Sequence, residues 1–234
     1  MIDMRAIMTA TALAVAATAT GYSLLSPDRA EAQSSRTESS RAASSRADAW
    51  NIGPIIKGRN YSQGMPLYLT PTRNGSAFDF PYPSARAGHV HYVTRDTASM
   101  AGARQIVLRY RIDAAPGTRF VPQEVPDQAA TLSLYFQRRG DDWKAKGDRQ
   151  YYRWYSPSGA LVDLSPGVHR LAVDLSAPWI SVLGRNSVDQ PRAFRDALAN
   201  AETVGFTFGS AGGRGHGVFA TAPARFTVLD FSVR

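Results

Sequence analysis

The sequence predicts an all-β protein, a two-sheet antiparallel β-sandwich of the jelly-roll type with one short helix. Short runs rich in β-branched and aromatic residues recur between turn signals, and only one segment shows helical periodicity. Residues 204–234 add an aromatic strand, a glycine-dense loop and a long final strand. Eight strands and a single helix within about 150 residues are typical of such a sandwich.

The predicted strands are short runs dominated by β-branched and aromatic residues. They are residues 89–95, 105–112, 131–138, 150–155, 168–175, 204–208, 217–220 and 226–233. The helix is predicted over residues 190–201, because Phe194 and Leu198 lie four apart and Pro191 stands in the first turn. Residues 51–84 are rich in proline and glycine, so we expect an extended wrap with one or two short strands at a sheet edge.

Alternation along these runs separates a core face from an outer face. The even-numbered residues of 105–112 and of 132–136 are apolar or aromatic, and we expect them in the core. In the final run, strict alternation puts Phe226 and Val228 on one face and Phe231 and Val233 on the other. This strand therefore either changes face or is covered on both sides.

The chain divides into three parts. Residues 1–32 are predicted to be a signal peptide, residues 33–49 a disordered Ser/Arg-rich spacer, and residues 50–234 the β-sandwich domain. The signal is indicated by an apolar run from Ala6 to Thr20 and an Ala-Glu-Ala cleavage site before Gln33. That run is shorter than the roughly 20 residues of a membrane span. We therefore expect cleavage, no stable membrane span, and a secreted or periplasmic protein.

Composition limits the chemistry. The chain has no cysteine, which excludes disulfides, thiolate metal sites and cysteine nucleophiles. Its net charge of +8 favours anionic partners such as acidic polysaccharide. Nucleic acid is not expected, because the arginines of the spacer are few and are diluted by Glu38 and Asp48.

The predicted outer faces carry aromatic and basic side chains. Tyrosine rings present flat apolar faces to the C–H groups of a sugar, and arginines make paired hydrogen bonds to carboxylate or sulfate. In residues 150–155, either Tyr152 and Trp154 or the three intervening side chains face outward. The alternative is that the tyrosines are half-buried and the arginines only solvate an outer face. The candidate ligand-binding residues are Arg109, Arg111, Tyr135, Gln137, Tyr151, Arg153, Tyr155 and, from the glycine-rich loop, His216.

The paired segments LYFQRRGDDW and YYRWYS and the closing ARFTVLDFSV, in this strand order, carry a family resemblance. Residues 89–234 resemble the galactose-binding-like jelly rolls that serve as carbohydrate-binding modules and as accessory domains of secreted glycosidases. The resemblance implies sugar binding on the concave sheet or at the loop ends. It also implies a structural calcium ion, because the last strand of such domains often holds an aspartate for calcium, and Asp230 stands in that place.

Two other groups of residues invite interpretation. His89 and His91 share a strand face, but no third metal ligand has a recognisable spacing, so a surface strand is the preferred interpretation. The acidic run from Gly140 to Asp148 lacks the spacing of an EF-hand, so a solvated hairpin loop is preferred over a calcium loop.

These observations favour an exported, non-catalytic protein that binds carbohydrate, with anionic glycans as the expected ligands. A jelly-roll polysaccharide lyase or a glycoside hydrolase is the first alternative. Tyr135-Phe136-Gln137 echoes the Tyr-Phe-Lys strand of alginate lyases, but it lies mid-chain, and no pair of carboxyl groups for hydrolysis can be identified. A structural or interaction domain of the cell envelope is the second alternative.

Overall fold

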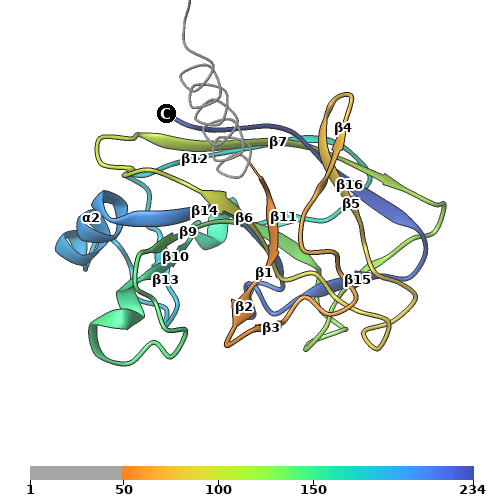
Figure 1. Cartoon of the computed structure of the whole chain (residues 1–234), viewed down its shortest axis with the longest axis horizontal. Coiled ribbons are helices and arrows are strands. Elements are labelled where there is room, and N and C mark those ends of the chain that lie inside the picture. Colours follow the sequence, from red (N-terminus) through yellow and green to blue (C-terminus); the bar gives the residue numbers. More distant parts are fainter. Residues whose placement is uncertain (1–48) are drawn as a thin grey trace, which may run out of the picture. The chain divides into compact units, whose positions relative to one another are not determined.

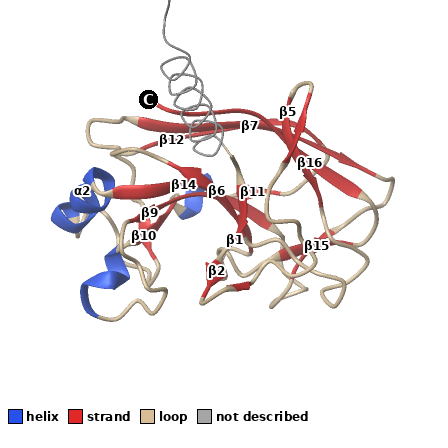
Figure 2. Cartoon of the chain, in the orientation of Figure 1, coloured by secondary structure: helices blue, strands red, loops and turns tan. Residues whose placement is uncertain are grey.

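The computed structural model describes residues 49–234. The predicted signal peptide and all but the last residue of the predicted spacer lie outside the described residues. Strands dominate the described part, which has one α-helix, α2 (Pro191–Ala199), and two short 3-10 turns, η1 (Gly147–Tyr151) and η2 (Ser158–Ala160) (Figure 2). The predicted all-β class and the single short helix are confirmed. No helix in this part of the chain is long and apolar enough to cross a membrane.

Two antiparallel sheets form the sandwich. The first comprises β1 (Asn51–Gly53), β6 (Tyr92–Asp96), β9 (Thr131–Arg138), β10 (Arg153–Tyr155), β11 (Val162–Asp163), β13 (Ile180–Ser181) and β14 (Ala201–Gly209). The second comprises β4 (Thr70–Thr72), β5 (Gly75–Asp79), β7 (Gln105–Ala114), β12 (Gly167–Asp174) and β16 (Ala224–Val233). The seven-stranded sheet has the order β1-β6-β14-β9-β10-β13 with β11 beside β9, and the five-stranded sheet has the order β12-β7-β16-β5-β4 (Figure 1). Two ribbons flank them, β2 (Ile55–Ile56) with β3 (Arg59–Asn60), and β8 (Phe120–Pro122) with β15 (Val218–Ala220).

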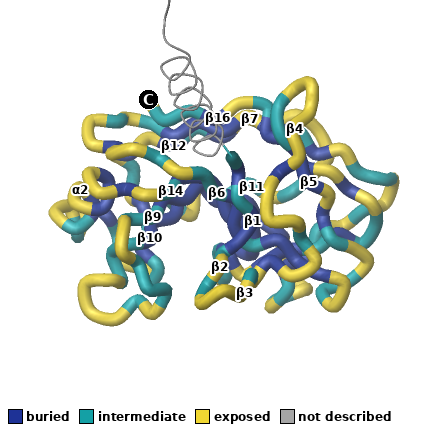
Figure 3. The backbone as a smooth tube through the Cα atoms, viewed as in Figure 1, coloured by how far each residue is buried: buried dark blue, intermediate teal, exposed yellow. Residues whose placement is uncertain are grey.

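The core lies between the facing strands of the two sheets (Figure 3). Phe226 of β16 stacks on Phe78 of β5 at a ring-centroid distance of 5.3 Å and on Phe206 of β14 at 5.2 Å, so its ring joins both sheets. The predicted core faces are confirmed, because the even-numbered residues of 106–112 and of 132–136 are all 1% exposed or less. Alternation therefore placed these side chains correctly.

The last strand changes face, which was one of the two predicted possibilities. Its register against β7 shifts between Val228 and Asp230, as a β-bulge produces. Phe226 and Val228 before the shift and Phe231 after it are consequently all buried in the core.

The N-terminal wrap is more regular than predicted. Residues 51–79 contain five short strands instead of one or two, and β5 lies inside its sheet between β16 and β4. Phe78 on β5 and Phe80 just after it are buried in the core, which explains why the segment joins the sheet. The prediction of a proline-bearing edge strand holds for β4, which carries Pro71 and ends the sheet order.

Gly205 supports the close approach of β6 and β14, and we predict that Gly205→Ala destabilises the protein. A Cβ atom at this position would lie 2.1 Å from the backbone oxygen of Val93 and 2.8 Å from the Cα of Thr94. Because the strand itself must shift, the free energy of unfolding should fall by about 3 kcal/mol. Urea unfolding measures the change. The control is Gly159→Ala, whose Cβ would have no heavy atom within 4 Å, and an equal loss of stability in the two variants would contradict this account.

Candidate functional site

Three tyrosines cluster on the outer face of the seven-stranded sheet. Tyr92 on β6 contacts Tyr135 on β9 at 4.9 Å between ring centroids, and Tyr135 contacts Tyr155 on β10 at 5.2 Å. The hydroxyls of Tyr92 and Tyr155 are hydrogen-bonded at 2.7 Å. Since their chain neighbours such as Phe136 and Trp154 face the core, these tyrosines point to the opposite side. All three are nonetheless buried, because loops cover this face.

A buried ion pair lies beside the tyrosines. The Arg153 Nε atom is 2.7 Å from an Asp141 carboxylate oxygen, and the two side chains are 7% and 0% exposed. Gln137 donates to the same carboxylate oxygen at 3.0 Å and accepts a hydrogen bond from the Tyr135 hydroxyl at 2.9 Å. Burial raises the pKa of the Asp141 carboxyl, and the neighbouring guanidinium acts against this rise. The prediction of a solvated loop at Asp141 is therefore wrong.

The loop after β9 places Trp143 over this ion pair. The Trp143 backbone N–H donates to the second Asp141 carboxylate oxygen at 3.1 Å, and Trp143 has a φ of 64°, in the left-handed region. Such a conformation costs a non-glycine residue about 1–3 kcal/mol and persists only where the surroundings enforce it. The indole ring contacts the Arg153 guanidinium at 4.8 Å and the Tyr92 ring at 5.4 Å.

The glycine-rich loop between β14 and β15 forms another part of the site. A Cβ atom at Gly215 would lie 2.4 Å from the Tyr92 hydroxyl, and one at Gly217 would lie 2.7 Å from the His91 ring. Both glycines have positive φ, so only glycine permits this close packing. The loop thereby brings Arg214 and His216 to the tyrosine cluster.

Arg214 is held by few partners. Its Nη2 atom donates to the Ser158 hydroxyl at 2.9 Å, while its buried Nε atom has no hydrogen-bond partner among the described residues. Burial lowers the pKa of the Arg214 guanidinium, because removal from water penalises its charge. A bound anion would supply the counter-charge that Arg214 lacks.

Two pockets open on this face, and Tyr92 lines both of them. The cationic pocket has a volume of about 380 Å³. Its lining residues that carry polar side chains are Tyr92, Arg153, Tyr155, Ser158, Ser181, Arg214 and His216. The apolar pocket has a volume of about 210 Å³. Its walls include Ile52, Pro54, Ile55, Tyr92, Tyr135, Gln137 and Trp143.

The structure brings together five of the eight predicted ligand-binding residues: Tyr135, Gln137, Arg153, Tyr155 and His216 each line one of the two pockets. Arg109 and Arg111 lie on β7 of the other sheet, so the predicted single surface is wrong for them. Tyr151 belongs to η1 and stacks on Trp154 at 6.2 Å between ring centroids, away from the cluster.

Sequence reasoning missed Tyr92, Trp143, Arg214 and Glu124. Arg214 had a usable signal, because it is a charged residue between Gly213 and Gly215 in the glycine-rich loop. Glu124 had none, because its partner His216 lies 92 residues away in the chain.

Metal binding gains no support from the arrangement of acidic and histidine side chains. Among residues 49–234 there is no group of three His, Asp or Glu that could hold a metal ion. Asp230 is exposed on β16 opposite Arg109, and calcium there stays a prediction. His89 is 4% exposed, and its ring lies 4.7 Å from that of His91 just before β6, so the surface-strand interpretation is wrong.

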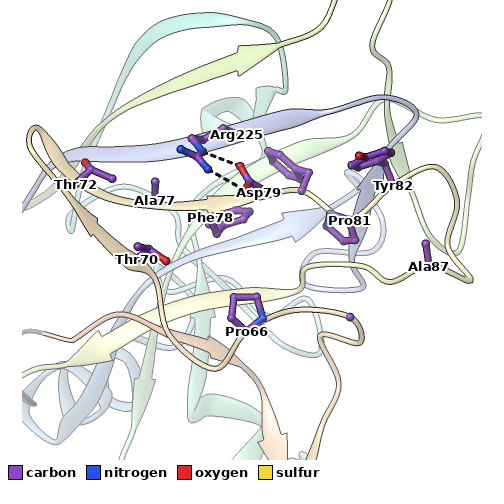
Figure 4. A pocket seen from close by; sticks show the side chains of 12 residues that line it. Pro66, Thr70, Thr72, Ala77, Phe78, Asp79, Pro81, Tyr82, Ala87 and Arg225 are labelled. Atoms are coloured by element: carbon purple, nitrogen blue, oxygen red, sulfur yellow. Dashed lines mark hydrogen bonds and ion pairs between the residues drawn. The ribbon is translucent and has the colours of Figure 1, made fainter.

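A pocket of about 410 Å³ lies elsewhere, beside β4 and β5 (Figure 4). Its charged groups, Asp79 and Arg225, face each other in a two-pronged ion pair of 2.7 and 2.9 Å. Hydrogen bonding from Arg225 lowers the pKa of the Asp79 carboxyl. Because these two charges satisfy each other, the cationic pocket is the better candidate for a charged ligand.

No protein-family model matches the chain, and no curated protein matches it. Solved structures with a similar arrangement of strands include CBM28, a carbohydrate-binding module specific for non-crystalline cellulose. Identity is 12%, the match covers 79% of this chain and 86% of that one, and the TM-score is 0.41. The xylan-binding module CBM15 matches at 14% identity over 79% of this chain and 94% of its own, with a TM-score of 0.37.

Xylanase10C from Cellvibrio japonicus, in complex with xylopentaose, matches at 12% identity over 80% of this chain and 27% of its own, with a TM-score of 0.38. Two of these three are carbohydrate-binding modules, the class that the sequence resembles. At such low identities and TM-scores, the likeness assigns neither a family nor a ligand to this chain.

We predict that His91 makes the protein sensitive to acid. Burial lowers the pKa of His91 from 6.5 to about 4, although a hydrogen bond to the Gly215 carbonyl acts against it. The unfolded chain takes up a proton below about pH 6.5 that the folded state refuses, so stability is lost as the pH falls through this window. The loss between pH 7 and pH 4 should be about 3 kcal/mol.

Urea unfolding across this pH range measures that loss. His91→Asn keeps a donor for the Gly215 carbonyl but does not titrate. Between pH 7 and pH 4 the variant should therefore lose about 3 kcal/mol less stability than the unmodified protein. Identical acid sensitivity in the two proteins would rule out His91 as the source.

Proposed function

We propose that this protein binds carbohydrate in the two pockets on the outer face of the seven-stranded sheet, and that its preferred ligands are anionic glycans. The observation that carries the proposal is the state of Arg214. This guanidinium is partly buried, has an unpartnered Nε atom, and forms no ion pair with a carboxylate of residues 49–234. A carboxylate or sulfate group on a sugar supplies the counter-charge that this guanidinium lacks.

The charge balance of the cationic pocket supports an acidic ligand. None of its described lining residues is acidic, whereas Arg153 and Arg214 both contribute to the wall. The charge of Arg153 is already balanced by Asp141, so Arg214 is the principal cation available to a ligand. The net charge of +8 adds a long-range attraction for polyanions that salt screens.

The apolar pocket suits the uncharged face of a sugar ring. Trp143 contributes an indole ring to its wall, and Ile55, which is 55% exposed, contributes an aliphatic surface. Gln137 and Thr203 supply hydrogen-bonding groups at the same place. Apolar walls with a few polar groups are typical of sugar-binding sites. Since Tyr92 borders both pockets, one glycan chain can occupy them together.

Because a signal peptide is predicted, we expect this binding to take place outside the cytoplasm, in the periplasm or the medium. Extracellular polysaccharide is the expected source of the ligand. The proposal leaves a purely structural envelope domain as its main competitor, which predicts a protein partner and no glycan binding.

We predict that Arg214→Gln weakens binding to acidic polysaccharide by about 10- to 100-fold, because each hydrogen bond to a charged group contributes about 1.5–3 kcal/mol. Affinity electrophoresis at low salt, in gels containing alginate, polygalacturonate or neutral xylan, measures it. Trp143→Ala should weaken binding to every polysaccharide whose gel retards the unmodified protein.

Arg109→Gln is the matched control, since it removes the same charge from an exposed position on the other sheet. It should bind like the unmodified protein. Retention by none of the three gels would overturn the proposal. Equal weakening by the two arginine variants would attribute binding to net charge instead of the pocket.

A further inference from the structure

We propose that the cationic pocket cleaves chains of uronic acids by β-elimination. This inference rests on the proposed function, because the same pocket must first bind the acidic sugar. Elimination needs a group that binds the carboxylate, a base for the proton on the adjacent carbon, and an acid for the leaving oxygen. The pocket assembles a candidate for each role from segments far apart in the sequence.

The base is His216. Its Nδ1 atom is hydrogen-bonded to the Glu124 carboxylate at 2.5 Å, and the two side chains are 52% and 58% exposed. When Nδ1 carries the proton donated to Glu124, the lone pair of the imidazole lies on Nε2. A carboxylate that holds the tautomer and stabilises the protonated ring is the arrangement that general-base catalysis by histidine uses. The ring lines the pocket in which the acidic sugar would bind.

The acid is the hydrogen-bonded pair Tyr92 and Tyr155. Their hydroxyls lie 2.7 Å apart, so one proton is held between the two oxygens and the second has no partner among the described residues. Both phenols carry their protons at neutral pH; burial raises their pKa, which opposes proton donation, while the charge of nearby Arg153 lowers it. The pair therefore offers one proton to a leaving oxygen in the pocket that both rings line.

The carboxylate-binding group is Arg214. Neutralising the carboxylate makes the hydrogen on the adjacent carbon more acidic, because the negative charge that develops there spreads onto the carboxylate oxygens. Arg153 lies in the same pocket wall, but its charge is engaged by Asp141. Arg214 thus serves binding and catalysis together.

The step is balanced without any further reactant. His216 Nε2 takes the proton from the carbon that bears the carboxylate. The electron pair of that C–H bond forms a carbon–carbon double bond to the neighbouring ring carbon, whose bond to the glycosidic oxygen breaks. That oxygen leaves with the proton of the tyrosine pair. Hydrolysis is disfavoured here, because it needs two carboxyl groups facing the bond and no described residue lining this pocket is acidic.

Incubation of the full-length protein with polygalacturonate and with alginate tests the inference. Elimination creates an unsaturated uronate end, which is followed by its ultraviolet absorbance while gel affinity is measured in parallel. We expect product from at least one polymer. His216→Gln should lower the rate at least about 100-fold, with affinity changed less than about threefold. Tyr155→Phe should also slow the reaction.

His169→Gln is the control, since His169 lies on β12 of the other sheet, and its rate should be unchanged. Binding of both polymers without unsaturated product overturns the inference and leaves the proposed function intact. Product formed equally fast by His216→Gln overturns the assigned base. Absence of binding overturns the proposed function itself.

Discussion

The outer face of this sandwich depends on the buried ion pair between Asp141 and Arg153. Two charges removed from water are stable only when they face each other with their remaining hydrogen bonds satisfied, and loss of either partner typically costs about 3–5 kcal/mol. Here the Asp141 carboxylate also accepts hydrogen bonds from Gln137 and from the Trp143 backbone. Asp141 thus anchors strand β9, the strained loop after it and the Arg153 guanidinium beside the tyrosines.

The two sides of the seven-stranded sheet have different chemistry because successive residues of a strand point in opposite directions. On β9 and β10, Phe136 and Trp154 enter the aromatic core while Tyr135 and Tyr155 form the outer cluster. The core therefore fixes the positions of the site residues through the same short strands. The loops do the rest, since Trp143 and the glycine-rich segment cover the tyrosines and each of them lines one of the two pockets.

The charged side chains of the site differ in whether a group of opposite charge faces them. Asp141 neutralises Arg153, and Glu124 orients His216, but among residues 49–234 Arg214 has only the Ser158 hydroxyl. In the interior of a protein such an imbalance would be costly, and at the wall of an open pocket it is the observation on which the proposed recognition of an anion rests. The pocket of Figure 4 has the opposite character, because Asp79 and Arg225 complete each other.

Local pattern determined much of this protein. Alternation and propensity identified the sandwich, the helix α2, the core faces of β7 and β9, and four of the strand residues that meet at the site. These features depend on residues close together in the chain, so a single sequence contains the information. Pairing between distant segments does not depend on residues close together in the chain, so local pattern did not determine it. Alternation assigned Arg109 to an outer face without showing that this face belongs to the other sheet.

Only the tertiary structure decided that the Tyr92 and Tyr155 hydroxyls, 63 residues apart, are hydrogen-bonded to each other. It also decided that the His91 ring is hydrogen-bonded to the glycine-rich loop, 124 residues away. It also placed Asp141 of the acidic loop in a buried ion pair with Arg153 instead of a solvated turn. The physical reason is that burial, and with it the strength of each charge interaction, is set by which strands pair and which loops cover them.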